Sequence, residues 1–212
     1  MPQIRELYLT AAASAAKLLA APQVAAGWHE PSALPKLSVQ GLAGHLAGQI
    51  FFIPKVLAEP VPTEEIISIQ EYYRRVSWIG SDIGDALNTA IRASGEQDAA
   101  DGPAALAARV EATVQELRTV LPAAPSRPVR RPSWGAWSIS LDDFVTSRLL
   151  EVAVHCDDLA HSVGVPTPEL PAEAIETVVD LLSRIALRRH GPTNVLRALS
   201  RAERAPASIS AL

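Results

Sequence analysis

The chain has 212 residues, of which 48% are hydrophobic and only 5% aromatic, and its formal net charge is −4 at pH 7. This length and apolar content suit one domain with its own core, and the mild negative charge excludes the basic footprint of a nucleic-acid-binding protein. The single Cys156 excludes an internal disulfide and favours a reducing compartment.

Two apolar stretches are poor candidates for membrane segments. Near the N-terminus, Glu6 and Lys17 interrupt any signal-peptide-like run. In residues 37–57, His45, Gln49 and Lys55 interrupt a candidate span. We therefore expect a soluble, cytoplasmic protein with neither a membrane nor a nucleic acid as partner.

The first half of the chain predicts helices separated by prolines. Residues 2–20 begin with Pro2, a good first-turn residue, and their helical period ends at Pro22, where a loop is expected. Ser38 is a suitable N-cap for a second helix, whose apolar face runs from Val39 to Ile53. A third element keeps the helical period over residues 66–90, including Ile83, with an uncertain start.

The second half continues this pattern. Residues 95–103 predict a polar turn, residues 106–121 a clean amphipathic helix, and residues 122–138 a long loop. Ser140 and Asp143 have the spacing of a capping box, which opens a helix that ends at Gly164. Pro171 starts another helix, and a short one follows over residues 195–200. No convincing period-two alternation is present, so we predict an all-α antiparallel bundle.

Glu151 and His155 are the first candidates for a functional site. They lie four residues apart on one predicted helix, so both side chains leave the same face, beside the apolar stripe. A carboxylate on a buried face is costly unless it is paired or coordinated, and a metal ion would satisfy this one. An ordinary hydrogen bond between the two side chains is the competing interpretation.

His45 strengthens the metal interpretation. It lies one residue off the apolar face of the second helix, among small residues that leave room for an ion: Gly41, Ala43, Gly44 and Gly48. A histidine bonded to a carbonyl in the core is the alternative. Two histidines and one glutamate are a zinc ligand set with an open position, and nickel, iron or manganese accept the same ligands.

Of three neighbouring residues, Asp158 and Arg148 have two interpretations each and Cys156 has one. Asp158 follows His155 by three residues and either orients it or caps a loop. Arg148 either neutralises Glu151, the interpretation we favour, or meets an anionic substrate as a catalytic residue. Cys156 points away from His155 and is expected to be a buried thiol.

Two stretches resemble a known family. The first stretch is Trp28-His29-Glu30-Pro31-Ser32, followed by Leu42-Ala43-Gly44-His45-Leu46. The second stretch is Arg148-Leu149-Leu150-Glu151 through Val154-His155-Cys156-Asp157-Asp158-Leu159. They resemble the first and the second signature of the mycothiol-dependent maleylpyruvate isomerase metal-binding domain. The resemblance implies a DinB-like antiparallel four-helix bundle over residues 1–165, up-down-down-up in order, with residues 166–212 as a C-terminal helical extension. It also implies that His45, Glu151 and His155 are metal ligands and that the cofactor is mycothiol, which agrees with an actinobacterial source.

Three functions are consistent with these residues. The first is a metal- and thiol-dependent transferase or isomerase-like enzyme, whose partners are a small-molecule thiol and an electrophilic substrate, with a homodimer as an open alternative to a monomer. The second is a non-catalytic metal- or ligand-binding module in stress response or regulation. The third is a bundle that keeps the ligands for structure, in which Asp158 would complete a closed four-ligand shell.

Overall fold

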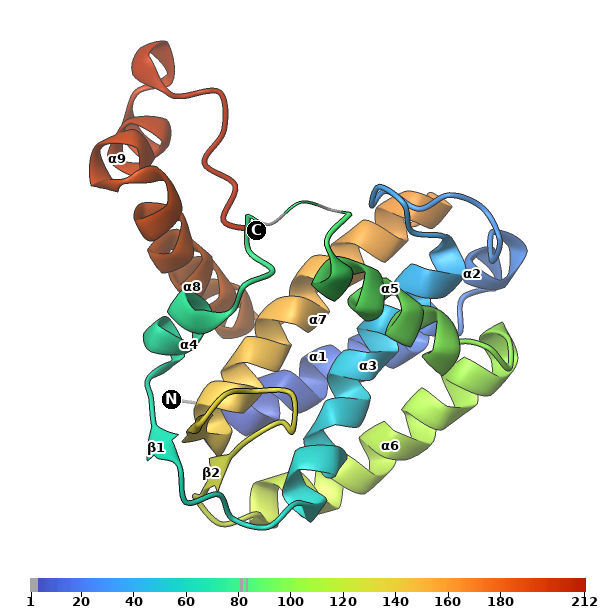
Figure 1. The fold of residues 1–212 in the computed structure, drawn as a ribbon. Helices are drawn as coiled ribbons and strands as arrows, with labels where there is room; N and C mark the ends of the chain where they lie inside the picture. The colour runs from blue at the N-terminus through green and yellow to red at the C-terminus, as the bar shows by residue number, and fades with distance from the viewer. Residues whose placement is uncertain (1–3, 81, 83) are drawn as a thin grey trace.

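Four long helices form the centre of the molecule. The computed structural model describes residues 4–80, 82 and 84–212, and the central helices are α1 (Ile4–Leu19), α3 (Val39–Ala58), α6 (Pro103–Ala123) and α7 (Leu141–Val163). Helices α1 and α3 each contact both α6 and α7. Figure 1 shows α1 and α7 running in one direction and α3 and α6 in the other. The expected helical bundle is confirmed, with an up-down-down-up order.

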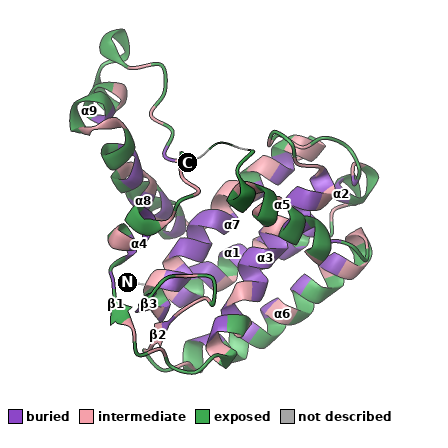
Figure 2. Cartoon of the chain, in the orientation of Figure 1, coloured by how far each residue is buried: buried purple, intermediate pink, exposed green. Residues whose placement is uncertain are grey.

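The core lies between these four helices, where the buried faces in Figure 2 turn inward. Apolar residues of α3 at helical spacing are fully buried, among them Leu42, Leu46, Ile50 and Ile53. Within the described residues, α3 is also the one helix that is long and apolar enough to cross a membrane, yet 67% of its apolar window is buried inside the protein. Packing in the bundle therefore accounts for its composition.

The predicted start of α3 and both predicted ends of α7 are confirmed. The Ser38 hydroxyl accepts a hydrogen bond from the Gly41 amide at 3.1 Å and caps α3. The Ser140 hydroxyl accepts from the Asp143 amide at 3.0 Å and caps α7, which ends at Gly164 with a left-handed φ of 68°. Each cap satisfies an amide that would otherwise lack a partner in the first turn. The predicted role of Pro2 lies outside the described residues.

The single helix predicted over residues 66–90 is wrong. Two helices occupy this region, α4 (Ile69–Arg75) and α5 (Ala86–Asp98). The chain leaves α4 at Val76 in an extended conformation and passes Gly80, whose φ of 76° favours glycine. Helix α4 buries Ile69, Tyr72 and Tyr73, whereas α5 buries only Gly95 and leaves Leu87 42% exposed, so the apolar spacing across this break does not mark one continuous buried face. The predicted position of Ile83 lies outside the described residues.

The polar turn predicted over residues 95–103 is confirmed only in its second half, because α5 continues through Gly95 to Asp98 and the turn to α6 occupies residues 99–102. Helix α5 packs so closely on α3 that a Cβ atom added to Gly44 would lie 1.9 Å from the Gly95 carbonyl oxygen. A Cβ atom added to Gly95 would lie 2.5 Å from the Gly41 carbonyl oxygen. The glycines of α3 that we expected to make room for an ion therefore make room for α5.

Short elements occupy segments that we predicted to be loops. A five-residue helix, α2 (Pro22–Ala26), begins at the proline that ends the N-terminal periodicity. Strand β3 (Trp137–Ser140) pairs in parallel with β1 (Glu65–Ile66) and antiparallel with β2 (Pro128–Val129). Strands this short show no period-two pattern, which explains why the sequence did not reveal them. The small sheet ties the segment after α3 to the segment before α7.

The C-terminal part lies outside the four-helix core. Helices α8 (Ala172–His190) and α9 (Pro192–Ser200) stand to one side of the bundle in Figure 1, and a 3-10 turn (Ala202–Arg204) precedes the tail. Helix α8 contacts α7, α4 and α1. We keep the boundary near residue 165, between a bundle domain and a helical extension, as a prediction.

Candidate metal centre

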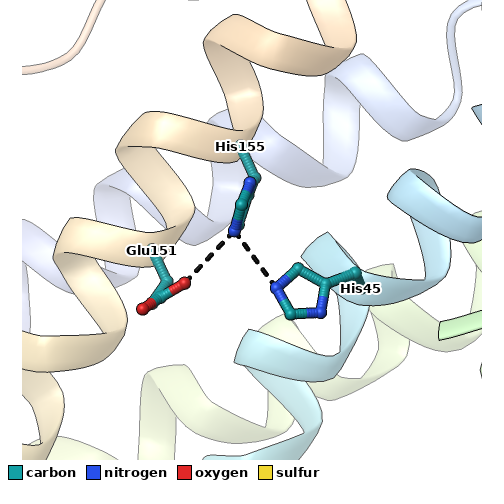
Figure 3. Close-up of side chains that lie close together, drawn as sticks. All are labelled: His45, Glu151 and His155. Atoms are coloured by element: carbon teal, nitrogen blue, oxygen red, sulfur yellow. Dashed lines mark hydrogen bonds and ion pairs between the residues drawn. The ribbon is translucent and has the colours of Figure 1, made fainter. Parts of the chain in front are cut away.

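The three residues selected from the sequence meet between two helices. His45 projects from α3, and Glu151 and His155 project from α7 one turn apart (Figure 3). The Nε2 atoms of His45 and His155 are 3.1 Å apart, and His155 Nε2 lies 3.2 Å from Glu151 Oε2. The three ligand atoms all lie within 4.8 Å of one another. The Glu151 and His155 side chains are only 9% and 13% exposed, so the cluster is largely shielded from bulk water.

Asp158 holds the far side of His155. Its Oδ2 accepts a hydrogen bond from His155 Nδ1 at 2.9 Å, which confirms the orienting role and excludes Asp158 from the set that converges on Nε2. The Ser162 hydroxyl donates to the Asp158 carbonyl at 2.6 Å, which links Ser162 to Asp158 within the last turns of α7. Because Nδ1 is held by this contact, Nε2 is the ring nitrogen of His155 that faces His45 and Glu151, and it would offer its lone pair to an ion once its proton is released.

Gln49 is a participant that sequence reasoning missed. Its Nε2 donates to the His45 carbonyl at 3.0 Å and lies 3.2 Å from His45 Nε2. Its Oε1 accepts a hydrogen bond from Arg148. The available signal was its position four residues after His45, which places it on the same face of α3.

Arg148 is buried and bonded to neutral groups. Its guanidinium donates to Gln49, to the Ser147 hydroxyl at 3.2 Å and to the Tyr72 hydroxyl at 3.4 Å, and the residue is 4% exposed. Within the described part of the chain it makes no ion pair with Glu151, so the favoured salt bridge is wrong. The geometric reason is that both terminal nitrogens of the guanidinium reach across to Gln49 on α3 and Tyr72 on α4.

The charges of the cluster are set by burial and by these contacts. Burial alone would raise the pKa of Glu151, but the hydrogen bond from His155 and the charge of Arg148 outweigh it and hold that pKa at about 2. Burial alone would lower the pKa of His155, but hydrogen bonds with Asp158 and Glu151 raise it to about 9. Burial and the neighbouring charge of His155 lower the pKa of His45 to about 3. Without an ion, a proton on His155 balances the Glu151 carboxylate.

Cys156 takes no part in the cluster. It is 1% exposed, as expected for a buried thiol, and burial raises its pKa to about 12. A thiol with so high a pKa is almost entirely protonated at neutral pH and is a poor nucleophile.

Comparison with known protein families places this geometry in context. The model of the family "mycothiol maleylpyruvate isomerase N-terminal domain" matches residues 8–160, which include His45, Glu151 and His155. The chain belongs to this family. The match ends within α7, so helices α8 and α9 lie beyond the matched region. Searches of curated proteins and of solved structures found no match.

Proposed function

We propose that this protein is an enzyme in which His45, Glu151 and His155 hold a divalent metal ion that activates a low-molecular-weight thiol, with mycothiol as the thiol. The observation that carries the proposal is the convergence of three ligand atoms with Asp158 turned away to His155 Nδ1. Three protein ligands leave a coordination position for a further group, as in catalytic zinc sites, whereas a structural site is closed by four.

The donor set fits an ion of zinc's size. Neighbouring ligand atoms in a tetrahedral site with bonds of about 2.0–2.1 Å lie roughly 3.3 Å apart. The two closest contacts of the cluster, 3.1 Å and 3.2 Å, are near this value. Zinc is our first choice, and nickel, iron and manganese accept the same nitrogen and oxygen donors.

The surrounding residues prepare the site. Asp158 fixes the ring orientation of His155, so its Nε2 faces the other two ligands. Arg148 holds the Gln49 side chain, whose amide in turn contacts the carbonyl of His45. In this proposal Arg148 is a positioning residue. Binding an anionic substrate, the other role suggested by the sequence, would require its buried guanidinium to give up a hydrogen bond to Gln49, Ser147 or Tyr72.

The bound ion would lower the pKa of a thiol and so favour the nucleophilic thiolate. The sulfur would form a bond with an electrophilic carbon, and the proton released by the thiol would end on the adduct. Such an addition needs no oxidant or reductant and is common to thiol transfer and to thiol-assisted isomerisation. The family's link to mycothiol supports this thiol and, with it, a cytoplasmic location.

A non-catalytic metal-binding module is the second candidate. It is favoured by the low exposure of the Glu151 and His155 side chains, which limits access to a bound ion. The two candidates differ in one property, because only the enzyme must admit a thiol to the ion.

The test is metal analysis followed by a thiol-dependent conjugation assay. We expect one zinc ion per chain and a conjugation rate that requires both zinc and mycothiol. Glu151→Gln and His45→Ala should lose the ion and the reaction, whereas Cys156→Ser, which alters a buried thiol outside the cluster, should retain both. Loss of turnover in Cys156→Ser with normal turnover in His45→Ala would refute the metal-thiol mechanism. Zinc binding without any thiol-dependent reaction would favour the binding module.

A further inference from the structure

Helix α8 buries one side against the bundle and exposes apolar side chains on another. It packs on α7, α4 and α1, and its buried residues include Ala174, Val178, Leu181 and Ile185. Ile175 and Val179 lie four residues apart on a different side of the helix, where they are 42% and 52% exposed. On α9, Leu196 and Leu199 are 66% and 71% exposed. We call these four exposed residues the outer α8–α9 face.

An apolar groove of about 380 Å³ joins the exposed residues of the two helices. Val179 of α8 and Leu199 of α9 both line it, and its lining is apolar apart from Ser183 and Ser210. The outer α8–α9 face therefore has a groove and, on the same surface, leucines that project into solvent. Apolar surface gathered in this way marks an interaction site, whereas single exposed apolar residues are normal.

The charges of α8 are separated along its length. The acidic residues lie in its first half and the arginines in its second half: Glu173, Glu176 and Asp180, then Arg184, Arg188 and Arg189. None of these side chains forms an ion pair within 4.0 Å in the described part of the chain. The helix dipole favours such an arrangement only in the first and last turns. Asp180 and Arg184 lie in the middle of α8, so the dipole does not account for them.

We propose that the outer α8–α9 face is the interface of a homodimer in which the two copies of α8 run antiparallel. An antiparallel partner brings the acidic half of each helix beside the basic half of the other, so both copies gain the same favourable contacts. A parallel partner would bring like charges together. A second copy is the occupant because the face is complementary to itself in charge and offers both a groove and projecting leucines.

Helix α8 is long enough for a stable interface. It has 19 residues, which span about 28 Å. A standard interface buries about 800 Å² on each partner, which is a patch roughly 28 Å across. The face lies beyond residues 8–160, the region matched by the family model, and contains none of the three candidate metal ligands. The proposal is therefore independent of the proposed function.

The test measures the mass of the protein in solution by analytical ultracentrifugation over a range of protein concentrations. We expect a dimer at twice the chain mass of 22.6 kDa. Val179→Asp should weaken dimerisation by about tenfold or more, because it buries a charge in an apolar interface. Val120→Asp, at a residue of α6 that is 42% exposed, is the matched control and should dimerise like the wild type. Circular dichroism verifies that each variant is folded.

Reversal of the central charges tests the antiparallel orientation. Asp180→Arg and Arg184→Asp should each weaken the dimer, most strongly at low salt, because each places like charges opposite one another across the interface. An equimolar mixture of the two variants should recover the affinity of the wild type, since each changed residue then meets an opposite charge on its partner. Loss in the single variants without recovery in the mixture would refute the antiparallel pairing.

Two further outcomes would overturn the proposal. One is a wild-type protein that stays monomeric at every concentration, and the other is wild-type dimer affinity in Val179→Asp. Sedimentation with vesicles of anionic phospholipid addresses a different occupant of the same face. Binding of the monomer to these vesicles that is lost in Val179→Asp and kept in Val120→Asp would assign the face to a membrane surface instead of a second copy.

Discussion

At the scale of single residues, His155 determines how the candidate metal centre responds to pH. In the metal-free protein its Nδ1 is bonded to Asp158 and its Nε2 faces Glu151, and the pKa is raised to about 9. An ion would need the Nε2 lone pair, so binding must release the proton that His155 carries below that pH. His45 and Glu151, with pKa values of about 3 and 2, release none at neutral pH.

We therefore predict that zinc binds more weakly as the pH falls below about 9, by about tenfold per pH unit for one displaced proton. Competition with a chromophoric chelator between pH 6 and 9 measures this slope. Asp158→Asn should lower the pKa of His155 and move the start of the decline to lower pH. An affinity that stays constant between pH 7 and 9 in the wild type would contradict the assignment.

At the scale of elements, the contact between α3 and α5 depends on glycine. Gly44 and Gly95 allow the two backbones to touch, and a Cβ atom on Gly44 would fall 1.9 Å from a carbonyl oxygen of α5. Gly48 lies one turn further along α3, and there a Cβ atom would meet its nearest neighbour, Asp98 Oδ2, at an ordinary 3.6 Å. The same substitution should therefore have opposite effects at two neighbouring positions.

We predict that Gly44→Ala lowers the free energy of unfolding by about 1–3 kcal/mol, because the helices must move apart. Gly48→Ala should raise it by about 0.5–1 kcal/mol, since alanine restricts the unfolded chain more than glycine does. Urea unfolding monitored by circular dichroism compares the two variants. Because α5 packs directly behind His45, Gly44→Ala should also weaken zinc binding, whereas equal stability of the two variants would disprove the close contact.

At the scale of the whole molecule, an ion at the candidate metal centre would bridge α3 and α7, which are far apart in sequence. Binding to the folded state alone stabilises it by about 2.7 kcal/mol when free metal is at 100 times the dissociation constant. For a chain of this length that corresponds to a rise of about 5–10 °C in melting temperature.

We predict that adding zinc to the chelated wild type raises its melting temperature by this amount, as measured by calorimetry. His45→Ala should show no rise, because the bridge loses its ligand from α3. Cys156→Ser is the control that keeps all three ligands and should respond like the wild type. An equal response of His45→Ala and the wild type would place the stabilising ion elsewhere in the protein.

Local signals in the sequence were sufficient to predict much of this protein. The caps at Ser38 and Ser140 and the left-handed stop at Gly164 lie where expected, because each depends on a few consecutive residues. The spacing of Glu151 and His155 placed both on one inward face for the same reason. The all-α antiparallel bundle followed from the periodicity of its helices, because periodicity marks a buried face whatever that face contacts, whereas the expectation of four helices came from the family resemblance.

Other features were decided only by the tertiary structure. The division between α4 and α5, the partners of Arg148 and the position of Arg131 on Phe52 all depend on contacts between residues far apart in the chain. Periodicity shows that a face is buried, but it does not show which helix covers it, so the glycines of α3 were assigned to an ion when they serve α5. A charge pattern likewise gives the sign of a side chain and not its partner, which depends on how the helices pack.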